Sequence, residues 1–234
     1  MELKDKIILV TGGSLGIGFA TAKKLIDKGA KVIITARNQE RLDKSAKEIG
    51  AIPYASDVSK EGDVIKVFQW IKKEFGGLDA LINNAGYGYF APLENIDEKK
   101  FQDVLQTNVI GAALAARESA KIFKEQNKGA IVNIASTAAL KGFENGTAYV
   151  ATKFALRGMT ECWRTELRRH NVRVILINPS QVQTEFAVTA GFDRGEINPT
   201  LITADDIAHT VVSALEMNDR CFITELTVFA TNPR

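Results

Sequence analysis

The sequence predicts an α/β fold, with a doubly wound parallel sheet of about seven strands and helices on both faces. Two observations lead to this prediction. Short runs rich in β-branched residues alternate along the chain with longer stretches of amphipathic helical pattern. The runs are also apolar almost throughout, which is typical of strands buried on both faces of a parallel sheet. Ligands bind such sheets beyond the carboxyl ends of the strands, so residues that follow strands are the first candidates for a site.

The expected elements follow the chain in strict alternation. The strands are expected at residues 6–10, 31–35, 52–55, 79–83, 130–136, 172–178 and 221–229. The helices are expected near residues 16–28, 39–48, 60–75, 98–126, 147–170 and 203–217. The helix expected over 147–170 has an apolar seam whose spacing fits either the core or a contact between subunits. The seam consists of Leu156, Met159, Trp163 and Leu167.

Length and composition suit one domain over residues 1–234. The chain has 234 residues, of which 45% are hydrophobic, enough to bury a substantial core. It contains no internal repeat and no obvious linker. The least regular stretch, residues 185–202, combines two glycines with several apolar residues. We expect this stretch to form a lid over the substrate.

Charge and composition argue against several classes of function. The net charge is +2, without a basic tail or stripe, so we expect no nucleic-acid partner. No apolar stretch approaches the roughly 18 residues of a membrane span, and no apolar signal region stands at the start. We therefore expect a cytoplasmic protein without a membrane partner. The two cysteines and two histidines lie too far from other ligands to predict a disulfide framework or a metal site.

A glycine-rich segment, Thr11–Gly18, follows the first expected strand and opens the first helix. Backbone N–H groups and the helix dipole at such a place favour a pyrophosphate, and glycines let the backbone approach it. The spacing is T-G-x-x-x-G-x-G and not the G-x-G-x-x-G fingerprint, so a tight turn without a ligand is the alternative. The predicted cofactor contacts here are Gly12, Ser14, Leu15, Gly16, Ile17 and Gly18.

The residues after the second expected strand predict which dinucleotide binds. NAD-binding sites usually place an acidic residue here to bind the ribose hydroxyls, but this chain has Ala36 and Arg37. A guanidinium can meet a 2′-phosphate with a charge-assisted contact. We therefore predict NADP(H), with Arg37 as the phosphate ligand. The alternative is a solvated arginine just before a helix.

Two further turns at the ends of strands are candidate cofactor contacts. Asp57 and Val58 follow the third strand and could hold the adenine edge, although Asp57 could equally begin a turn that Ser59 caps. Asn84, Ala85 and Gly86 follow the fourth strand and offer small residues and amides beside a ribose. The alternative for this second turn is a purely structural role.

Tyr149 and Lys153 stand four positions apart in an expected helix, so they share one face. A phenol with the ordinary pKa of about 10 is a poor base near neutral pH. A neighbouring ammonium stabilises phenolate and lowers that pKa, which would make the tyrosine a usable acid/base. Ser136, thirteen positions upstream of Tyr149, ends a strand and could join them. An exposed helix face is the alternative for the pair alone.

Taken together, these motifs resemble the short-chain dehydrogenase/reductase family, whose Rossmann-type fold matches the predicted sheet. The resemblance spans nearly the whole chain and is strongest to small bacterial oxidoreductases described as 3-oxoacyl-carrier-protein reductase-like. The motifs that carry it are Thr11-Gly12-x-x-x-Gly16-Ile17-Gly18, Asn83-Asn84-Ala85-Gly86, Asn108, Ser136 and Tyr149-x-x-x-Lys153. The chain departs from the family in having Pro179-Ser180 where Pro-Gly is usual and in lacking a glycine-rich C-terminal end.

The resemblance implies roles for individual residues. Tyr149 would be the catalytic acid/base, and Lys153 would lower its pKa and bind the nicotinamide ribose. Ser136 would hydrogen-bond the substrate oxygen, and Asn108 would hold a water in a proton relay to Lys153. The chain segment after the sixth strand would grip the nicotinamide amide and the phosphates through Pro179, Val182 and Thr184.

The resemblance also implies a function. We expect an NADPH-dependent oxidoreductase that reduces a ketone or aldehyde, 3-oxoacyl compounds included, and that assembles as a homotetramer or dimer. The alternatives are an alcohol or sugar dehydrogenase working oxidatively, or a non-catalytic NADP-binding regulator. Apolar residues expected around the substrate favour an apolar or mildly polar carbonyl compound. They lie at 87–90, 138–140, Phe143 and 186–192.

Overall fold

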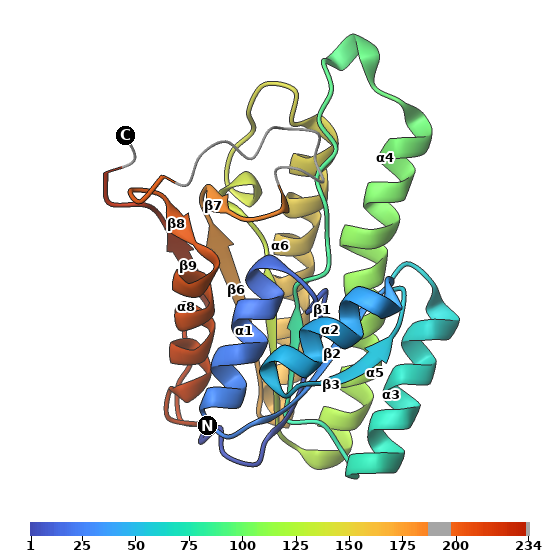
Figure 1. Ribbon diagram of the computed structural model, residues 1–234, viewed down its shortest axis with the longest axis vertical. Coiled ribbons are helices and arrows are strands. Elements are labelled where there is room, and N and C mark those ends of the chain that lie inside the picture. The colour runs from blue at the N-terminus through green and yellow to red at the C-terminus, as the bar shows by residue number, and fades with distance from the viewer. Residues whose placement is uncertain (187–197, 233–234) are drawn as a thin grey trace.

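The computed structural model describes residues 1–186 and 198–232 of the chain. Its centre is a seven-stranded sheet in the order β3-β2-β1-β4-β5-β6-β9, with every neighbouring pair parallel (Figure 1). The strands are β1 (Ile7–Thr11), β2 (Lys31–Ala36), β3 (Ile52–Ala55), β4 (Ala80–Asn83), β5 (Gly129–Ile134), β6 (Val172–Pro179) and β9 (Glu225–Val228). The predicted doubly wound parallel sheet of seven strands is confirmed.

Helices cover both faces of this sheet. The helices are α1 (Gly16–Asp27), α2 (Gln39–Ile49), α3 (Glu61–Phe75), α4 (Glu98–Leu105), α5 (Ala112–Gln126), α6 (Thr147–Leu167) and α8 (Ala204–Glu216). Alternate side chains of one strand enter two different cores. Ile8 and Val10 pack with α1, α2 and α8, whereas Leu9 packs with α3, α5 and α6. This two-sided burial explains why the strands read as continuous apolar runs.

The strand order places a crevice at the carboxyl edge of the sheet. The chain winds outward from β1 to β3, returns to β4 beside β1, and continues in the other direction to β9. Such a reversal leaves a gap between successive crossovers, where ligands of doubly wound sheets bind. The ends of β1 and β4 meet there, since Val10 pairs with Ile82.

One predicted helix, residues 98–126, is wrong as a continuous α-helix. Between α4 and α5 the chain forms a π-helical segment, Gln106–Gly111, that contains the buried Asn108. Gly111 lies against the backbone of Val58, whose carbonyl oxygen is 2.9 Å from where a Cβ at Gly111 would stand. The widened turn thus accompanies two non-local contacts, at Asn108 and Gly111, which a helical pattern does not reveal.

The last predicted strand was too long, because only Glu225–Val228 pairs with β6. Residues before it form a turn in which the Cys221 N–H donates to the Asn218 carbonyl. A small second sheet was not predicted: β7 (Val182–Gln183) pairs with β8 (Ile202–Thr203). This pairing joins the two ends of the expected lid over 185–202. Residues 187–197 of that prediction lie outside the described residues.

The apolar seam on α6 belongs largely to the core. Leu156 and Leu167 are buried, and Met159 and Trp163 are partly buried against the same clusters. The seam is therefore not an exposed subunit contact, and the expected homo-oligomer stays a prediction.

Beneath the carboxyl edge of the sheet, a ladder of buried amides and a hydroxyl joins strands to helices. The Asn83 side chain donates to the Asn133 amide oxygen (3.2 Å) and to the Ala112 carbonyl (3.0 Å). Asn133 donates in turn to the Thr160 hydroxyl (2.8 Å), which donates to the Leu156 carbonyl (2.6 Å). Buried polar groups are tolerated when paired in this way. The ladder fixes α6 against β4 and β5.

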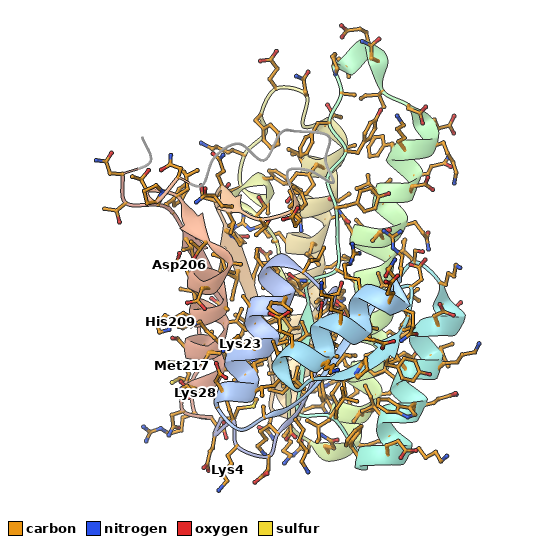
Figure 2. The ribbon with its side chains drawn as sticks, in the orientation of Figure 1. Lys4, Lys23, Lys28, Asp206, His209 and Met217 are labelled. Atoms are coloured by element: carbon orange, nitrogen blue, oxygen red, sulfur yellow. The ribbon has the colours of Figure 1, made fainter. Side chains whose placement is uncertain are left out.

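The outer layer formed by α1 and α8 is held by charged contacts. Lys28 pairs with Glu216 at 2.8 Å, and Lys24 pairs with Asp205 at 2.9 Å. Figure 2 shows Lys23 on α1, Lys28 just after the end of that helix, and His209 on the neighbouring α8. Over residues 1–186 and 198–232, no group of histidine, cysteine or acidic side chains could hold a metal ion. Among those same residues, no helix is long and apolar enough to span a membrane.

Candidate active site

A cavity of about 1290 Å³ opens at the carboxyl edge of the sheet, at the predicted crevice. It runs from the glycine-rich loop after β1 to the loop before α6. Its lining includes the following predicted residues: Gly12, Ser14, Leu15, Gly16, Ile17, Arg37, Asp57, Val58, Asn84, Ala85, Gly86, Ser136, Tyr149, Lys153, Pro179, Val182 and Thr184. The remaining two predicted residues, Gly18 and Asn108, lie behind the lining and support it.

The glycine-rich loop is held by the neighbouring strands. The Thr11 hydroxyl accepts the backbone N–H groups of Asn84 and Ala85, both at 3.1 Å. The Asn84 side chain donates to the carbonyls of Thr11 and Gly12. Glycine is required at position 18, because a Cβ there would collide with the Gly12 carbonyl and the Asn84 amide. The loop is therefore rigid before any ligand arrives.

The loop leaves the start of α1 open to the cavity. Leu15 is the N-cap residue, and no side chain caps the first backbone N–H groups of the helix. Gly16 has a φ of +54°, a left-handed conformation that favours glycine. The place of a Gly16 Cβ is 3.4 Å from Thr184, so the chain after β6 lies directly opposite. Uncapped N–H groups at a helix start suit a pyrophosphate.

Two arginines line the far end of the cavity, beyond β2. Arg37 was predicted, whereas Arg41 was missed; both are exposed and both line the cavity. Neither forms an ion pair with a carboxylate in the described part of the chain. Asn38 explains the placement of Arg41, since its side chain caps α2 by accepting the Arg41 N–H at 2.8 Å. That cap places Arg41 in the first turn of α2, next to the end of β2.

Asp57 shapes a turn and also lines the cavity, and its contact with the adenine stays a prediction. Its carboxylate accepts both the backbone N–H and the hydroxyl of Ser59, at 3.0 and 2.7 Å, and so shapes the turn before α3. Asp57 and Val58 nevertheless line the cavity. Ser59 is not the helix cap, because the N-cap residue of α3 is Lys60.

Ser136, Tyr149 and Lys153 meet at the closed end of the cavity. Tyr149 and Lys153 lie one turn apart on α6 and are 8% and 7% exposed. The Lys153 ammonium donates to the Ile134 carbonyl at 3.0 Å and lies 5.6 Å from the centroid of the Tyr149 ring. Ser136 hydrogen-bonds to the Tyr149 side chain. The structure therefore brings together three of the four predicted catalytic residues.

Asn108, the fourth, supports the site from the π-helical segment. Its amide oxygen accepts the Tyr87 N–H (3.1 Å), and its amide nitrogen donates to the Tyr87 carbonyl (2.9 Å) and to the Thr152 hydroxyl (3.2 Å). Thr152 donates to the Tyr149 carbonyl at 2.7 Å. The Asn108 side chain thus connects the turn after β4 to the helix that carries Tyr149 and Lys153. Sequence reasoning missed Thr152, although it directly precedes Lys153.

Aromatic rings surround the Tyr149 phenol. Phe90 and Phe186 each lie against it, with ring centroids 5.4 and 5.5 Å away, and Phe90 also contacts Phe143 at 5.9 Å. Tyr87 and Ala138 join the lining as predicted, whereas Tyr89, Ala139 and Leu140 do not line the cavity. The Tyr89 hydroxyl instead accepts the N–H of Asp97 at 2.7 Å. The predicted wall over 187–192 lies outside the described residues.

Comparison with known proteins accounts for this arrangement. The family described as short chain dehydrogenase matches residues 6–194. The chain belongs to this family. A 3alpha-hydroxysteroid dehydrogenase of Mediterraneibacter gnavus is 33% identical over 213 residues, which cover 87% of this chain and 83% of that protein.

Two solved structures show the same fold with NADP or an NADP derivative bound. A metagenomic short-chain oxidoreductase in complex with NADP superposes with a TM-score of 0.86 at 32% identity, covering 99% of this chain and all of that one. An alcohol dehydrogenase from the archaeon Thermococcus sibiricus, complexed with 5-hydroxy-NADP, superposes with a TM-score of 0.90 at 28% identity, covering 99% of both chains. Both neighbours therefore hold NADP or a derivative of it in this fold.

The cavity of this short-chain dehydrogenase fits that cofactor. The uncapped start of α1 suits the pyrophosphate, and the glycines leave room for it. Arg37 and Arg41 offer two guanidinium groups where a 2′-phosphate would lie, and Ala36 offers no carboxylate to repel it. Lys153, Ser136 and Tyr149 lie at the opposite end, where the nicotinamide would lie.

The pKa values of Tyr149 and Lys153 differ from expectation. Burial raises the pKa of Tyr149 to about 12, although the hydrogen bond from Ser136 acts in the opposite direction. Burial also lowers the pKa of Lys153 to about 8. The expected lowering of the Tyr149 pKa by Lys153 is therefore wrong. Lys153 gives up its proton well below the pH at which the phenol titrates, so no cation remains to stabilise phenolate there.

Proposed function

We propose that this short-chain dehydrogenase is an NADPH-dependent carbonyl reductase that converts a ketone or aldehyde to an alcohol. One observation carries the proposal: the buried Tyr149 phenol lies beside Ser136 and Lys153 in the lining of a cavity that fits NADP(H). The bound cofactor supplies the hydride, which adds to the carbonyl carbon as the C=O π bond breaks. The substrate oxygen then needs a proton, and Tyr149 is placed to give it.

The raised pKa of Tyr149 supports the reductive direction. With a pKa of about 12, the phenol holds its proton near neutral pH and is a donor rather than a base. The Ser136 hydroxyl, hydrogen-bonded to the same phenol, would hold the substrate oxygen beside it. An oxidative enzyme would need the phenolate, which burial disfavours in this site. Oxidation of an alcohol or sugar is therefore the second candidate.

Lys153 supports the same step in two ways. Its pKa of about 8 leaves the amine mostly protonated near neutral pH, and the ammonium is anchored on the Ile134 carbonyl. The cation would favour the negative charge that develops on the tyrosine oxygen as the proton leaves. Its place in the lining would also let it bind the nicotinamide ribose.

We assign Asn108 a positioning role. Its amide is committed to both backbone groups of Tyr87 and to Thr152, so its side chain has little capacity left to hold a relay water. Removing it would disturb the turn after β4 and the start of α6 together. Loss of Asn108 would therefore misalign Tyr149 and Lys153, but it would not remove a group that transfers a proton.

Other observations favour an apolar substrate and an active enzyme. Phe90, Phe143 and Phe186 line the substrate end, and the related dehydrogenase of Mediterraneibacter gnavus bears the name of a hydroxysteroid, itself a largely apolar molecule. A non-catalytic NADP-binding regulator, the rival hypothesis, would need no proton donor beside the nicotinamide. The contacts of the buried Tyr149 and Lys153 and of the half-buried Ser136 argue against that rival.

A screen of ketones and aldehydes with NADPH tests the proposal, with turnover measured as the loss of NADPH absorbance. We expect turnover on apolar ketones in wild-type protein and little in Tyr149→Phe. Binding of NADPH without turnover of any carbonyl compound would favour the regulator. Turnover only of alcohols or sugars with NADP⁺ would favour the oxidative enzyme, and selective turnover of phosphorylated sugars would contradict the apolar pocket.

A further inference from the structure

Three phenylalanine rings form the wall of the cavity beside Tyr149. Phe90 lies between Tyr149 and Phe143, with ring centroids 5.4 and 5.9 Å away and interplanar angles of 56° and 40°. Phe186 meets Tyr149 from another side at 5.5 Å, also at 56°. Two rings therefore meet the phenol directly, and the third, Phe143, reaches it through Phe90.

Glycines allow two of these rings to lie against the backbone. A Cβ at position 88 would overlap the Phe90 ring and come within 3.0 Å of Phe186, and a Cβ at position 146 would overlap Phe143. The two loops are also tied together, since the Ala91 N–H donates to the Asn145 carbonyl at 3.0 Å. The rings are thus held by their loops before a substrate enters.

Held rings discriminate between substrate shapes. Aromatic pairs in offset or tilted arrangements gain attraction beyond that of buried area, and a rigid flat ligand gives up little conformational freedom on binding. A flexible acyl chain gains only the area term and must give up its rotamers. Phe143 is 50% exposed, so the mouth has an apolar face still available to a ring.

Charge is divided along the lining. Arg37 and Arg41 line the end of the cavity beyond β2, whereas the phenylalanine rings line the end beside Tyr149. Glu144 directly follows Phe143 and also lines the cavity. A substrate with its own carboxylate would therefore approach the rings past like charge.

We propose that the substrate is an uncharged ketone whose carbonyl is attached to, or part of, a flat ring, and that Phe90, Phe143 and Glu144 determine this selection. The ring lies against the phenylalanines, and its carbonyl oxygen faces Ser136 and Tyr149. This inference rests on the proposed carbonyl reductase activity. It narrows that activity away from linear 3-oxoacyl substrates and from keto acids.

Two matched pairs of ketones test the inference, each measured as kcat/KM with saturating NADPH. Acetophenone and 2-octanone have the same number of carbon atoms but differ in shape. We expect acetophenone to be preferred about tenfold, from ring contacts that the linear chain cannot make. Phe143→Leu and Phe90→Leu should each reduce the preference to about threefold or less, by removing one ring.

Methyl 4-acetylbenzoate and 4-acetylbenzoate differ at the far end of the ring, where the ester replaces the negative charge with one methyl group. We expect the ester to be preferred about fivefold, the scale of a partly screened charge contact. Glu144→Gln should narrow this difference, and so should higher salt. Leu93→Ala is the matched control, because Leu93 is exposed in the same loop as Phe90 but does not line the cavity.

The outcomes separate this inference from the proposed function. Equal or better turnover of 2-octanone would overturn the selection for a ring, and equal or better turnover of 4-acetylbenzoate would overturn the selection for a neutral substrate. A shift in the acetophenone preference caused by Leu93→Ala would also count against the assigned residues. Absence of turnover on every ketone would remove the proposed function, and this inference with it.

Discussion

Arg41 should contribute to NADP(H) selection about as much as Arg37. Each guanidinium can make a charge-assisted contact to a 2′-phosphate, worth about 1.5 to 3 kcal/mol when shielded from water. Both arginines are exposed, so solvent and salt weaken the contact to about 1 kcal/mol each, or roughly fivefold in binding. Losing both should weaken recognition of the 2′-phosphate by about 25-fold if the contributions are independent.

Binding of adenosine 2′,5′-bisphosphate and of adenosine 5′-monophosphate measures this contribution directly, because the two ligands differ by one phosphate. Calorimetry on wild-type protein, Arg37→Ala, Arg41→Ala and the double variant gives a full cycle. We expect each single change to weaken only the bisphosphate, and the effect to shrink as salt rises. Lys47→Ala is the control, because it removes a charge from the last turn of α2, away from the cavity.

An unchanged bisphosphate affinity in Arg41→Ala would refute the assignment of Arg41. If Arg41→Ala and Lys47→Ala weakened bisphosphate binding equally, the effect would come from the overall charge of the protein and not from a contact between Arg41 and the 2′-phosphate. Beyond binding, Ala36→Asp combined with Arg37→Ala should shift kcat/KM toward NADH by adding repulsion against the 2′-phosphate. Equal or better use of NADH by the wild-type enzyme would contradict the predicted preference for NADPH.

The remaining predictions concern the catalytic end and the glycine-rich loop. Tyr149→Phe should lower turnover by about two or more orders of magnitude while NADPH binding, followed by fluorescence, stays near wild type; a rate close to wild type with chemistry limiting would exclude Tyr149 as the proton donor. Burial lowers the pKa of Lys153 from 10.5 to about 8, so the unfolded chain binds more protons than the folded chain between these two pH values. The free energy of unfolding should therefore rise with pH across this range. Denaturant titrations at several pH values should show the rise in wild-type protein and not in Lys153→Met. Reductive kcat/KM should fall as pH rises through about 8, where the ammonium is lost, and a flat profile would speak against its role. Gly18→Ala should cost about 1 to 3 kcal/mol of stability through overlap with the Gly12 carbonyl, whereas Gly62→Ala, whose Cβ meets nothing within 4 Å, should leave Tm unchanged or higher.

Features encoded in short stretches of sequence were predictable. The glycine-rich loop follows from glycine spacing between a strand and a helix, and the Tyr149 and Lys153 pair follows from helical periodicity. Each of these depends on neighbours within a few residues. Burial on both faces of the strands likewise followed from their composition, because every strand of a parallel sheet meets the same environment.

Features that depend on distant residues were not predictable. Asn108 lies in a π-helical segment and contacts Tyr87 and Thr152 from other parts of the chain. Arg41 was missed for another reason, since the Asn38 cap that places it in the first turn of α2 stands only three residues before it. The direction of the Tyr149 pKa depends on how completely the fold excludes water, which spacing alone cannot reveal.

The buried amide ladder has a consequence for how such an enzyme diversifies. The hydrogen bond between Asn133 and Thr160 fixes α6 against β5. Ser136 follows β5 and Tyr149 lies on α6, so this contact below the pocket sets the distance between the serine and the phenol. The rings that face the substrate stand instead on loops outside the ladder. Substitutions in those loops can therefore exchange one substrate for another while the proton donor keeps its alignment. A chimaera that imports α6 from a relative should carry the matching partner of Thr160 with it.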